Sequence, residues 1–363
     1  MVGTGETSVQ RAATLLVTGA GAPGIRGTLY ALRKNPDRMP LRIIGIDLKS
    51  DVVGRFLVDR FYQVPSPEDS RYVEALLDIC EKEKVEIVVP QTTREINVLS
   101  RWADIFARAG FQIMVSPWPA IKVANDKGRL LQKFKDMALP VPDCSLAHSE
   151  EELRAVARRL GYPARPVVVK PPSSNGMRGV RILTEDAWDV QRFISEKPSG
   201  LEISLEDVIR ILRRGAAWPE LLVMEHLPGP EYSVDAFIGE KTEVAIPRLR
   251  KSIRSGITFE AVLDLRKDLS DCALRAAREI GLRYAVGFQF KLDEDNVAKV
   301  LECNPRVQGT MVASLFSGVN VIWMGVKELL GEPPAEAVMA SGDALFYRFW
   351  GGVGIRGTEV FEI

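Results

Sequence analysis

The stretch from Gly287 to Arg306 reads GFQFKLDEDNVAKVLECNPR, and it decides the fold prediction. Two largely apolar runs, Gly287–Leu292 and Ala298–Cys303, flank the polar turn Asp293–Asn296. Short runs of this kind around a polar turn predict a pair of antiparallel strands. The sequence therefore predicts a hairpin whose second strand ends in a polar cluster.

Three oxygen-bearing side chains interrupt this hairpin, namely Gln289, Glu302 and Asn304. Glu302 and Asn304 share a face because side chains alternate along a strand. Donors of this kind suit Mg²⁺, which takes nucleotide phosphates and water as its remaining ligands. A structural hydrogen bond would explain any one of the three residues, so the metal site is indicated only by the set.

A second stretch, Leu222–Asp235, reads LVMEHLPGPEYSVD. It predicts a strand that leaves a sheet, turns at Pro-Gly-Pro and returns as another strand. Backbone groups at such a crossing can pair with an adenine edge, and Glu231 after the turn can hold ribose hydroxyls. Alone, Glu231 would be a solvated hairpin residue.

A third stretch, Val167–Val180, reads VVVKPPSSNGMRGV. It predicts a strand that ends at Lys170, followed by a small, Ser- and Gly-rich loop. Backbone N–H groups of such a loop can surround phosphate oxygens, while the lysine supplies a positive charge. An ordinary turn beside a lysine is the alternative explanation.

The first ~115 residues alternate apolar runs with helical patterns, which predicts a parallel sheet flanked by helices. The expected strands include Thr14–Thr18, Leu41–Asp47 and Val85–Pro90. Between the first strand and its helix, Gly19–Gly24 matches GxGxxG, and Asp47 follows 23 residues later. This pattern leaves open a nicotinamide-dependent oxidoreductase that binds its cofactor at Gly19–Gly24. Pro23 is unusual in such a loop, and a lone GxGxxG is a weak signal.

Composition narrows the remaining classes. The 363 residues carry 48 Lys+Arg and 48 Asp+Glu, so a general nucleic-acid binder or an anionic-membrane binder is not expected. The four cysteines form no CxxC pair, and no apolar run reaches the ~18 residues of a membrane helix. The N-terminal Met1–Gln10 lacks the apolar core of a signal peptide, so a cytoplasmic enzyme is expected.

Taken in order, these features resemble the ATP-grasp superfamily, specifically its carbamoyl-phosphate-synthetase-like branch, over roughly Thr14 to Leu330. The resemblance implies ATP and Mg²⁺ (or Mn²⁺) as cofactors, and a metal set of Gln289, Glu302 and Asn304. It implies that Arg306 and Arg254 act on the transferred phosphate and the acyl group. It further assigns nucleotide contacts to Lys127, Lys170, Ser173, Ser174, Asn175, Gly176, Gly179, Glu225, His226, Leu227, Glu231 and Gln289.

The implied fold mixes α/β and α+β parts: a Rossmann-like parallel-sheet domain (1–115) precedes two lobes that sandwich ATP. The small lobe with a linker helix is expected at 116–225, and the large lobe with the metal site at 226–363. Helical segments are expected at Ala124–Met137, Ser199–Glu220 and Val312–Leu330.

The implied activity is that of a carboxylate–amine ligase, which forms an acyl phosphate and ADP and then joins the acyl group to an amine. A carbamate or carboxylate kinase of the same fold stays open. The partners implied are a small carboxylate and an amine, and a homodimer is compatible with the family. Pro171 and Pro172 beside the phosphate loop, and Arg178 inside it, depart from the usual Gly-rich form, which leaves the acceptor undefined.

Overall fold

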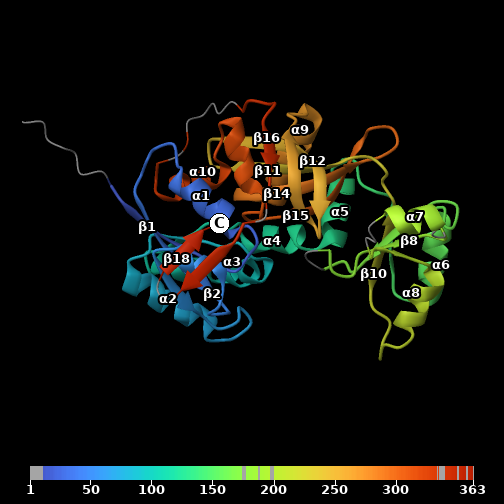
Figure 1. Cartoon of the computed structure of the whole chain (residues 1–363), viewed down its shortest axis with the longest axis horizontal. Coiled ribbons are helices and arrows are strands. Elements are labelled where there is room, and N and C mark those ends of the chain that lie inside the picture. The colour runs from blue at the N-terminus through green and yellow to red at the C-terminus, as the bar shows by residue number, and fades with distance from the viewer. Residues whose placement is uncertain are drawn as a thin grey trace, which may run out of the picture.

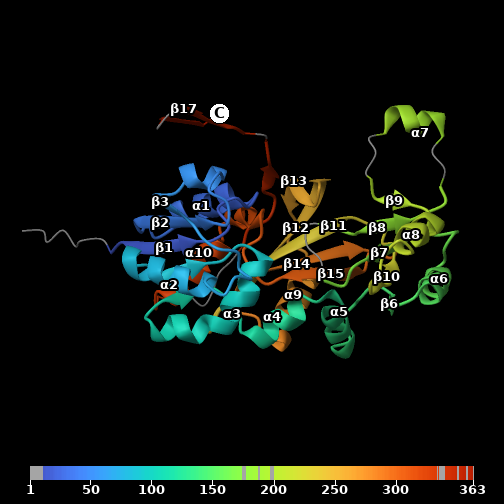
Figure 2. The ribbon, with the colours of Figure 1, turned by 90° about the horizontal axis from the view of Figure 1, so that it is seen from below.

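The computed structural model describes residues 11–173, 177–186, 189–196, 200–332, 334, 340–349, 351–356 and 359–362. Three larger sheets organise the chain, with a short hairpin near its C-terminal end. Sheet A lies at one end of the long axis, sheet C in the middle and sheet B at the other end (Figure 1, Figure 2).

Sheet A is the parallel sheet that the N-terminal pattern predicted, and that prediction is confirmed. Its central strands are buried because helices cover both faces, which is why they read as continuous apolar runs. The Thr92 side chain caps the third helix, and Glu95 returns a bond to the Thr92 backbone. The strands, in the order β3-β2-β1-β4-β5, are β1 (Ala13–Val17), β2 (Leu41–Asp47), β3 (Arg60–Gln63), β4 (Ile87–Val89) and β5 (Gln112–Ile113), and the helices are α1 (Ile25–Arg33), the 3-10 turn η1 (Val53–Phe56), α2 (Tyr72–Glu83) and α3 (Thr93–Arg108).

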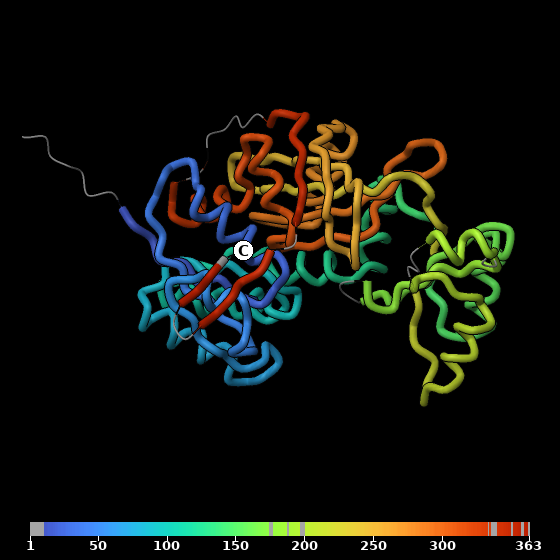
Figure 3. Tube along the Cα trace, in the orientation of Figure 1, coloured from blue at the N-terminus to red at the C-terminus, as the bar shows by residue number. Residues whose placement is uncertain are grey.

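Sheet B is smaller, and all but one of its strand pairs are antiparallel. Helices α6 and α8 bury one face of it in a core of their own. Two passages of the chain join sheet B to the rest: the chain enters after helix α5 (Lys127–Asp136) and leaves after β10 (Figure 3). The elements, with strand order β6-β10-β7-β8-β9, are β6 (Cys144–Ala147), α6 (Glu150–Arg159), β7 (Val167–Lys170), β8 (Arg181–Leu183), α7 (Val190–Ser195), β9 (Glu202–Ile203), α8 (Leu205–Leu212) and β10 (Leu221–Glu225).

Sheet C is fully antiparallel and contains the hairpin with which the sequence prediction began. Helix α9 packs on one of its faces, and helices α4 and α5 contribute to the same core. The elements, with strand order β15-β14-β11-β12-β13-β16, are α4 (Trp118–Ala124), α5 (Lys127–Asp136), β11 (Glu231–Ile238), β12 (Glu243–Arg254), β13 (Ile257–Leu263), α9 (Lys267–Ile280), β14 (Tyr284–Leu292), β15 (Ala298–Asn304), the 3-10 turn η2 (Met311–Ser317), α10 (Val321–Leu329) and β16 (Leu345–Tyr347), followed by the separate hairpin β17 (Val353–Arg356) and β18 (Glu359–Glu362).

The second face of sheet C changes character along its length. Phe237 and Ile246 at one end share a core with Leu15 and Leu29 of the N-terminal part and with α10. At the other end the same face carries charged side chains from β11, β12, β14 and β15. The polar end is therefore the part of this face where a charged ligand can be received.

Three predicted helices differ in the structure. Segment 124–137 is interrupted by Asn125–Asp126, where the Asp126 side chain caps a new helix, α5. Segment 312–330 breaks at Gly318, whose φ of 86° lies in the left-handed region that ends helices. Residue 199 lies outside the described residues, and within 200–220 the chain is helical only in α8. The domain boundaries at 115 and 225 stay predictions.

Candidate active site

The three predicted metal donors meet on one face of β14 and β15. Gln289 lies opposite Glu302 in the strand register, and Asn304 Nδ2 donates a hydrogen bond to Glu302 Oε1 at 3.0 Å. Phe288 and Phe290 point to the opposite face, into the core. The structure thus brings the three side chains together at the polar end of sheet C.

This donor set fits a hard cation that also binds phosphate. Glu302 is its one carboxylate, and the described residues hold no cluster of three or more His, Cys, Asp or Glu that could bind a metal alone. Asn304 Oδ1 accepts a hydrogen bond from Arg306 Nη2 at 3.1 Å, so Asn304 would coordinate an ion only after its amide turns over. Mg²⁺ commonly takes one or two protein carboxylates and completes its shell with substrate phosphates.

Lys127 and Lys170 come from different elements and converge beside Glu302. Lys127 begins α5, its Nζ lies 3.8 Å from Glu302 Oε2, and its backbone N–H donates to Pro172 O at 3.1 Å. Lys170 ends β7 and is 6% exposed. Burial lowers the pKa of Lys170 to about 8; the charge of Glu302 opposes this shift, and the charge of Lys127 adds to it.

The Lys170 side chain makes no hydrogen bond or ion pair within the described part of the chain. A buried ammonium without a partner costs free energy, and an anion bound at this point would remove that cost. The two lysines and Glu302 therefore form a place for a phosphate chain that carries a metal ion.

Arg306 stands where the N-terminal part meets the metal strands. Its Nε donates to Thr93 Oγ1 at 3.3 Å, at the first turn of α3, and its Nη1 donates to Val307 O at 3.0 Å. Burial lowers the pKa of Arg306, while the charge of Glu302 raises it. The guanidinium is thus held between Asn304 and the first turn of α3, and the acyl-binding role predicted for Arg306 stays a prediction.

Arg254 lies apart from Arg306. Its guanidinium stacks over the ring of Phe259 at 4.7 Å, on the exposed end of β12. Among the described residues no hydrogen bond joins it to Arg306 or to a metal donor. The catalytic role predicted for Arg254 stays a prediction.

The predicted phosphate loop is described only in part, since Ser174, Asn175 and Gly176 lie outside the described residues. Ser173 is exposed, and Gly179 has a φ of 75°. A Cβ at Gly179 would lie 2.6 Å from Cδ of Pro171, so Pro171 packs directly on this glycine. The unusual proline therefore closes the base of the loop and requires glycine opposite it.

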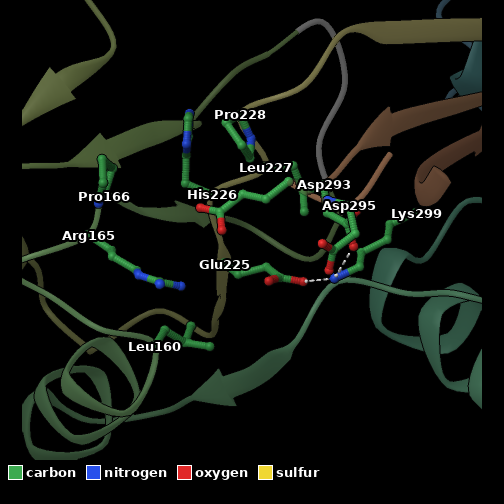
Figure 4. A pocket seen from close by; sticks show the side chains of 11 residues that line it. Leu160, Arg165, Pro166, Glu225, His226, Leu227, Pro228, Asp293, Asp295 and Lys299 are labelled. Atoms are coloured by element: carbon green, nitrogen blue, oxygen red, sulfur yellow. Dashed lines mark hydrogen bonds and ion pairs between the residues drawn. The ribbon is translucent and has the colours of Figure 1, made fainter. Parts of the chain in front are cut away.

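Glu225, His226 and Leu227, which follow one another where the chain leaves sheet B and are called the hinge below, line a cleft of about 460 Å³ (Figure 4). Glu225 Oε1 accepts from Lys299 Nζ at 2.8 Å and from the Asp143 backbone at 2.9 Å. Lys299 also forms an ion pair with Asp293 at 3.2 Å. Through Lys299, the Glu225 carboxylate is therefore linked to the β14–β15 turn. Because Glu225 pairs with Val167 and side chains alternate, it points to the opposite face of sheet B from Lys170.

The Glu225 side chain is thus bonded to Asp143 and Lys299, so the adenine contact predicted at this place would have to be made by backbone groups. The backbone N–H groups of His226 and Leu227 make no hydrogen bond within the residues that the structure describes, and Leu227 is buried. Burial also lowers the pKa of His226. Unpaired donors of this kind are what a heterocycle edge needs.

The sequence analysis missed two arginines of β12 that share the polar face. Arg248 Nε forms a buried ion pair with Asp235 at 2.8 Å. Arg250 forms an ion pair with Glu231, the predicted ribose contact. A pattern in the sequence could have indicated this pairing. Pro247–Arg250 holds two arginines spaced by one residue, and the preceding predicted strand holds two acids four residues apart.

The glycine-rich turn Gly19–Gly24 makes close contacts with other parts of the chain. Asp47 Oδ2 accepts from the Gly21 backbone N–H at 2.7 Å, so the acid that would hold a ribose is already bonded to the turn itself. A Cβ at Gly24 would lie 2.4 Å from the Cα of Gly309, just beyond the metal strand. The oxidoreductase alternative is not favoured by this geometry.

Comparisons with known proteins give two family matches and a set of related chains. The family "ATP-grasp in the biosynthetic pathway with Ter operon" matches residues 217–346, and the family "PylC-like, N-terminal domain" matches residues 15–114. The arginine-specific large chain of carbamoyl phosphate synthase from Bacillus subtilis is 24% identical over 288 residues, which are 76% of this chain and 25% of that protein. The chain thus spans about a quarter of the length of this relative.

Solved structures share the fold. The biotin carboxylase domain dimer of the 2-oxoglutarate carboxylase from Hydrogenobacter thermophilus, in complex with MgADP, ADP and bicarbonate, has a TM-score of 0.69 at 17% identity and covers 96% of this chain and 83% of its own. N5-carboxyaminoimidazole synthetase from Staphylococcus aureus complexed with ADP has a TM-score of 0.64 at 13% identity, covering 92% and 80%. In the part of the chain that the structure describes, no helix combines the length and the apolar character needed to span a membrane.

Proposed function

The chain belongs to the ATP-grasp superfamily as a single ATP-grasp unit related to the large chain of carbamoyl phosphate synthase, and on this premise we propose that it is an ADP-forming carboxylate–amine ligase. Its homologues are ATP-dependent ligases of this superfamily. The observation that carries the proposal is Lys170, a buried ammonium with no partner in the described chain, placed beside Lys127 and Glu302.

The residues of this chain divide the work of phosphoryl transfer. Lys127 and Lys170 neutralise the triphosphate, so that an anionic carboxylate can approach the γ-phosphorus. A Mg²⁺ ion held by Glu302 and Gln289, with Asn304 after its amide turns, would add positive charge at the same phosphates. Arg306 holds the carboxylate and then the oxyanion that develops when the amine attacks the acyl phosphate.

No enzyme nucleophile is required in this mechanism. The carboxylate oxygen bonds to the γ-phosphorus as ADP departs, and the amine nitrogen then displaces inorganic phosphate from the acyl carbon. The protein's part is to hold three reactants in order and to shield the acyl phosphate from water.

The decisive experiment is a product analysis with Mg²⁺, ATP and a panel of amino acids, small carboxylates and bicarbonate. The ligase predicts ADP and inorganic phosphate in equal amounts when carboxylate and amine are both present. Hydroxylamine in place of the amine should trap a hydroxamate. Release of AMP and pyrophosphate would overturn the proposal, because adenylation attacks the α-phosphorus. Lys170→Met is the matched inactive control.

A carboxylate or carbamate kinase is the second candidate, favoured by the bicarbonate that accompanies MgADP in the Hydrogenobacter structure. It predicts ADP formation with bicarbonate or a carboxylate alone and a phosphorylated product without added amine. That same neighbour is a domain dimer, and we extend to this chain the prediction of a homodimer, which light scattering tests directly. The cytoplasmic location stays a prediction.

A further inference from the structure

We propose that Arg250 is a positioning residue that couples the ribose contact of the nucleotide site to the hairpin turn Ser255–Gly256. Recognition of the sugar would thereby fix the position of the turn that lies next to the phosphate loop. The inference rests on the proposed function, since it takes Glu231 as the ribose contact.

The Arg250 guanidinium uses all three of its nitrogens on different groups. Nη1 forms the ion pair with Glu231 Oε1, at the start of β11. Nε donates to Thr258 Oγ1 at 2.8 Å, and Nη2 donates to Gly256 O at 2.7 Å. One rigid, planar group therefore bridges the first residue of β11, the β12–β13 turn and strand β13.

Burial makes this arrangement specific. Arg250 is 7% exposed, and burial lowers its pKa while the Glu231 charge raises it. A buried guanidinium must have its donors satisfied, so moving any one of the three acceptors leaves a donor unpaired. Glu231 and the turn are thus held at a fixed separation by the same side chain.

The turn that Arg250 anchors is a two-residue loop between the paired residues Arg254 and Ile257. Ser255 and Gly256 have φ angles of 49° and 78°, which is the combination of a type I′ hairpin turn. A Cβ at Gly256 would lie 3.2 Å from Cγ of Met177, which belongs to the described end of the phosphate loop. The anchored turn is therefore the surface on which Met177 rests.

Arg248 on the same strand supplies a matched contrast. It is also buried and ion-paired, and its Nη1 donates a long hydrogen bond to Thr258 Oγ1 at 3.5 Å, but its partner Asp235 lies in the sheet interior with Gln308, away from Glu231 and Gly256. A substitution at Arg248 disturbs a buried ion pair of the same sheet without removing any bond to the ribose contact or to the turn carbonyl.

The test measures sugar selectivity and turnover separately. Calorimetry gives the dissociation constants of ADP, 2′-deoxyADP and 3′-deoxyADP, and phosphate release gives kcat. We expect wild type to prefer ADP over a deoxy analogue by about tenfold, the factor carried by one hydrogen bond to a charged group. Glu231→Gln and Arg250→Met should each bring this ratio close to one, and the double variant should lose no more than either single variant.

Arg250→Lys separates the two ends of the bridge. A lysine keeps the positive charge beside Glu231, so sugar selectivity should stay within about threefold of wild type, but it cannot also bind Thr258 and Gly256, so kcat should fall about tenfold. Thr258→Val, which removes one acceptor of the bridge, should lower kcat without changing sugar selectivity, and Arg248→Lys should keep the wild-type sugar ratio.

The outcomes distinguish the two proposals. If wild type fails to bind ADP, the proposed function is wrong and this inference goes with it. If ADP binds with the expected sugar preference and a folded Arg250→Met protein keeps that preference, the inference alone is overturned. Should Arg250→Met fail to fold, a lysine variant with wild-type kcat gives the same negative answer.

Discussion

Arg248 and Lys170 are both cations with almost no solvent exposure, 1% and 6% respectively, but their surroundings are opposite. Arg248 is held by Asp235, Thr258 and the peptide framework of sheet C. Lys170 has a second lysine as a neighbour and no hydrogen-bonded partner among the described residues. The first charge is balanced by an ion pair within the fold, whereas the second is offset only in part, by the nearby charge of Glu302, until an anion binds. This difference distinguishes a structural cation from a ligand-binding one.

The largest effect is expected from Lys170→Met, which removes the cation that awaits phosphate. The kcat/KM for ATP should fall by about 10²–10³-fold, the loss typical for removing one group that stabilises transition-state charge. The melting temperature without nucleotide should rise, because a pKa that drops from 10.5 to about 8 represents about 3 kcal/mol of unfavourable charging at pH 7. Steady-state kinetics and a thermal melt check both. Retained activity with a lower melting temperature would contradict the comparison.

Arg248→Met should destabilise the nucleotide-free protein, whereas Lys170→Met should stabilise it. It leaves Asp235 as an uncompensated buried carboxylate, for which a cost of about 3–5 kcal/mol in the free energy of unfolding is expected. Urea denaturation of the nucleotide-free protein measures it. Adding Asp235→Leu to the same chain should recover most of the loss, since both charges are then gone. If Arg248→Met left the free energy of unfolding unchanged, the Arg248–Asp235 ion pair would not be what stabilises these two buried charges.

The pH dependence of ATP use should follow Lys170. Below pH 8 the free enzyme carries the charged ammonium that binds phosphate, and above it the charge is lost, so log kcat/KM should fall with rising pH through about 8. In the same window the nucleotide-free fold should become more stable, because between pH 8 and 10.5 the unfolded chain binds the proton that the folded chain has released. A kcat/KM profile that is flat to pH 9.5 would assign the phosphate contact elsewhere.

The smallest effect is expected from Lys299→Met, an intermediate case between the two cations. Lys299 is partly exposed and pairs with both Glu225 and Asp293. The solvent screens such pairs, so a loss of about 1 kcal/mol in unfolding free energy is expected, along with a change of a few-fold in the KM for ATP through the hinge. A loss of unfolding free energy as large as that of Arg248→Met would mean that the Lys299–Glu225 ion pair stabilises the fold as much as the buried Arg248–Asp235 pair.

The metal strands and the parallel sheet could be predicted because their signals are local. Gln289, Glu302 and Asn304 belong to one hairpin, so strand alternation and the turn between them determine how they face each other. The central strands of sheet A are buried on both sides, which leaves continuous apolar runs in the sequence.

The rest depends on contacts between distant segments. Arg250 meets Glu231 and Gly256 across two strand pairs, and nothing in its neighbours along the chain names those partners. The Gly19–Gly24 motif has the form of a dinucleotide-binding turn. In the structure its Gly24 packs against Gly309, which lies 285 residues further along the chain. Even the helix predicted at 312–330 failed through one residue, Gly318, whose backbone conformation no apolar periodicity reveals.

The close approach of Gly24 to Gly309 also bears on how this chain can be recombined with others. The face of sheet A that carries α1 does not have a separate core. Its β1 and α1 share one hydrophobic core with α10 and with the inner strands of sheet C. A parallel-sheet domain grafted from a relative would need a matching glycine and a matching α10 to settle in the same place. Sheet B carries a self-contained core and two connecting passages, so it is the piece that can be exchanged as a module.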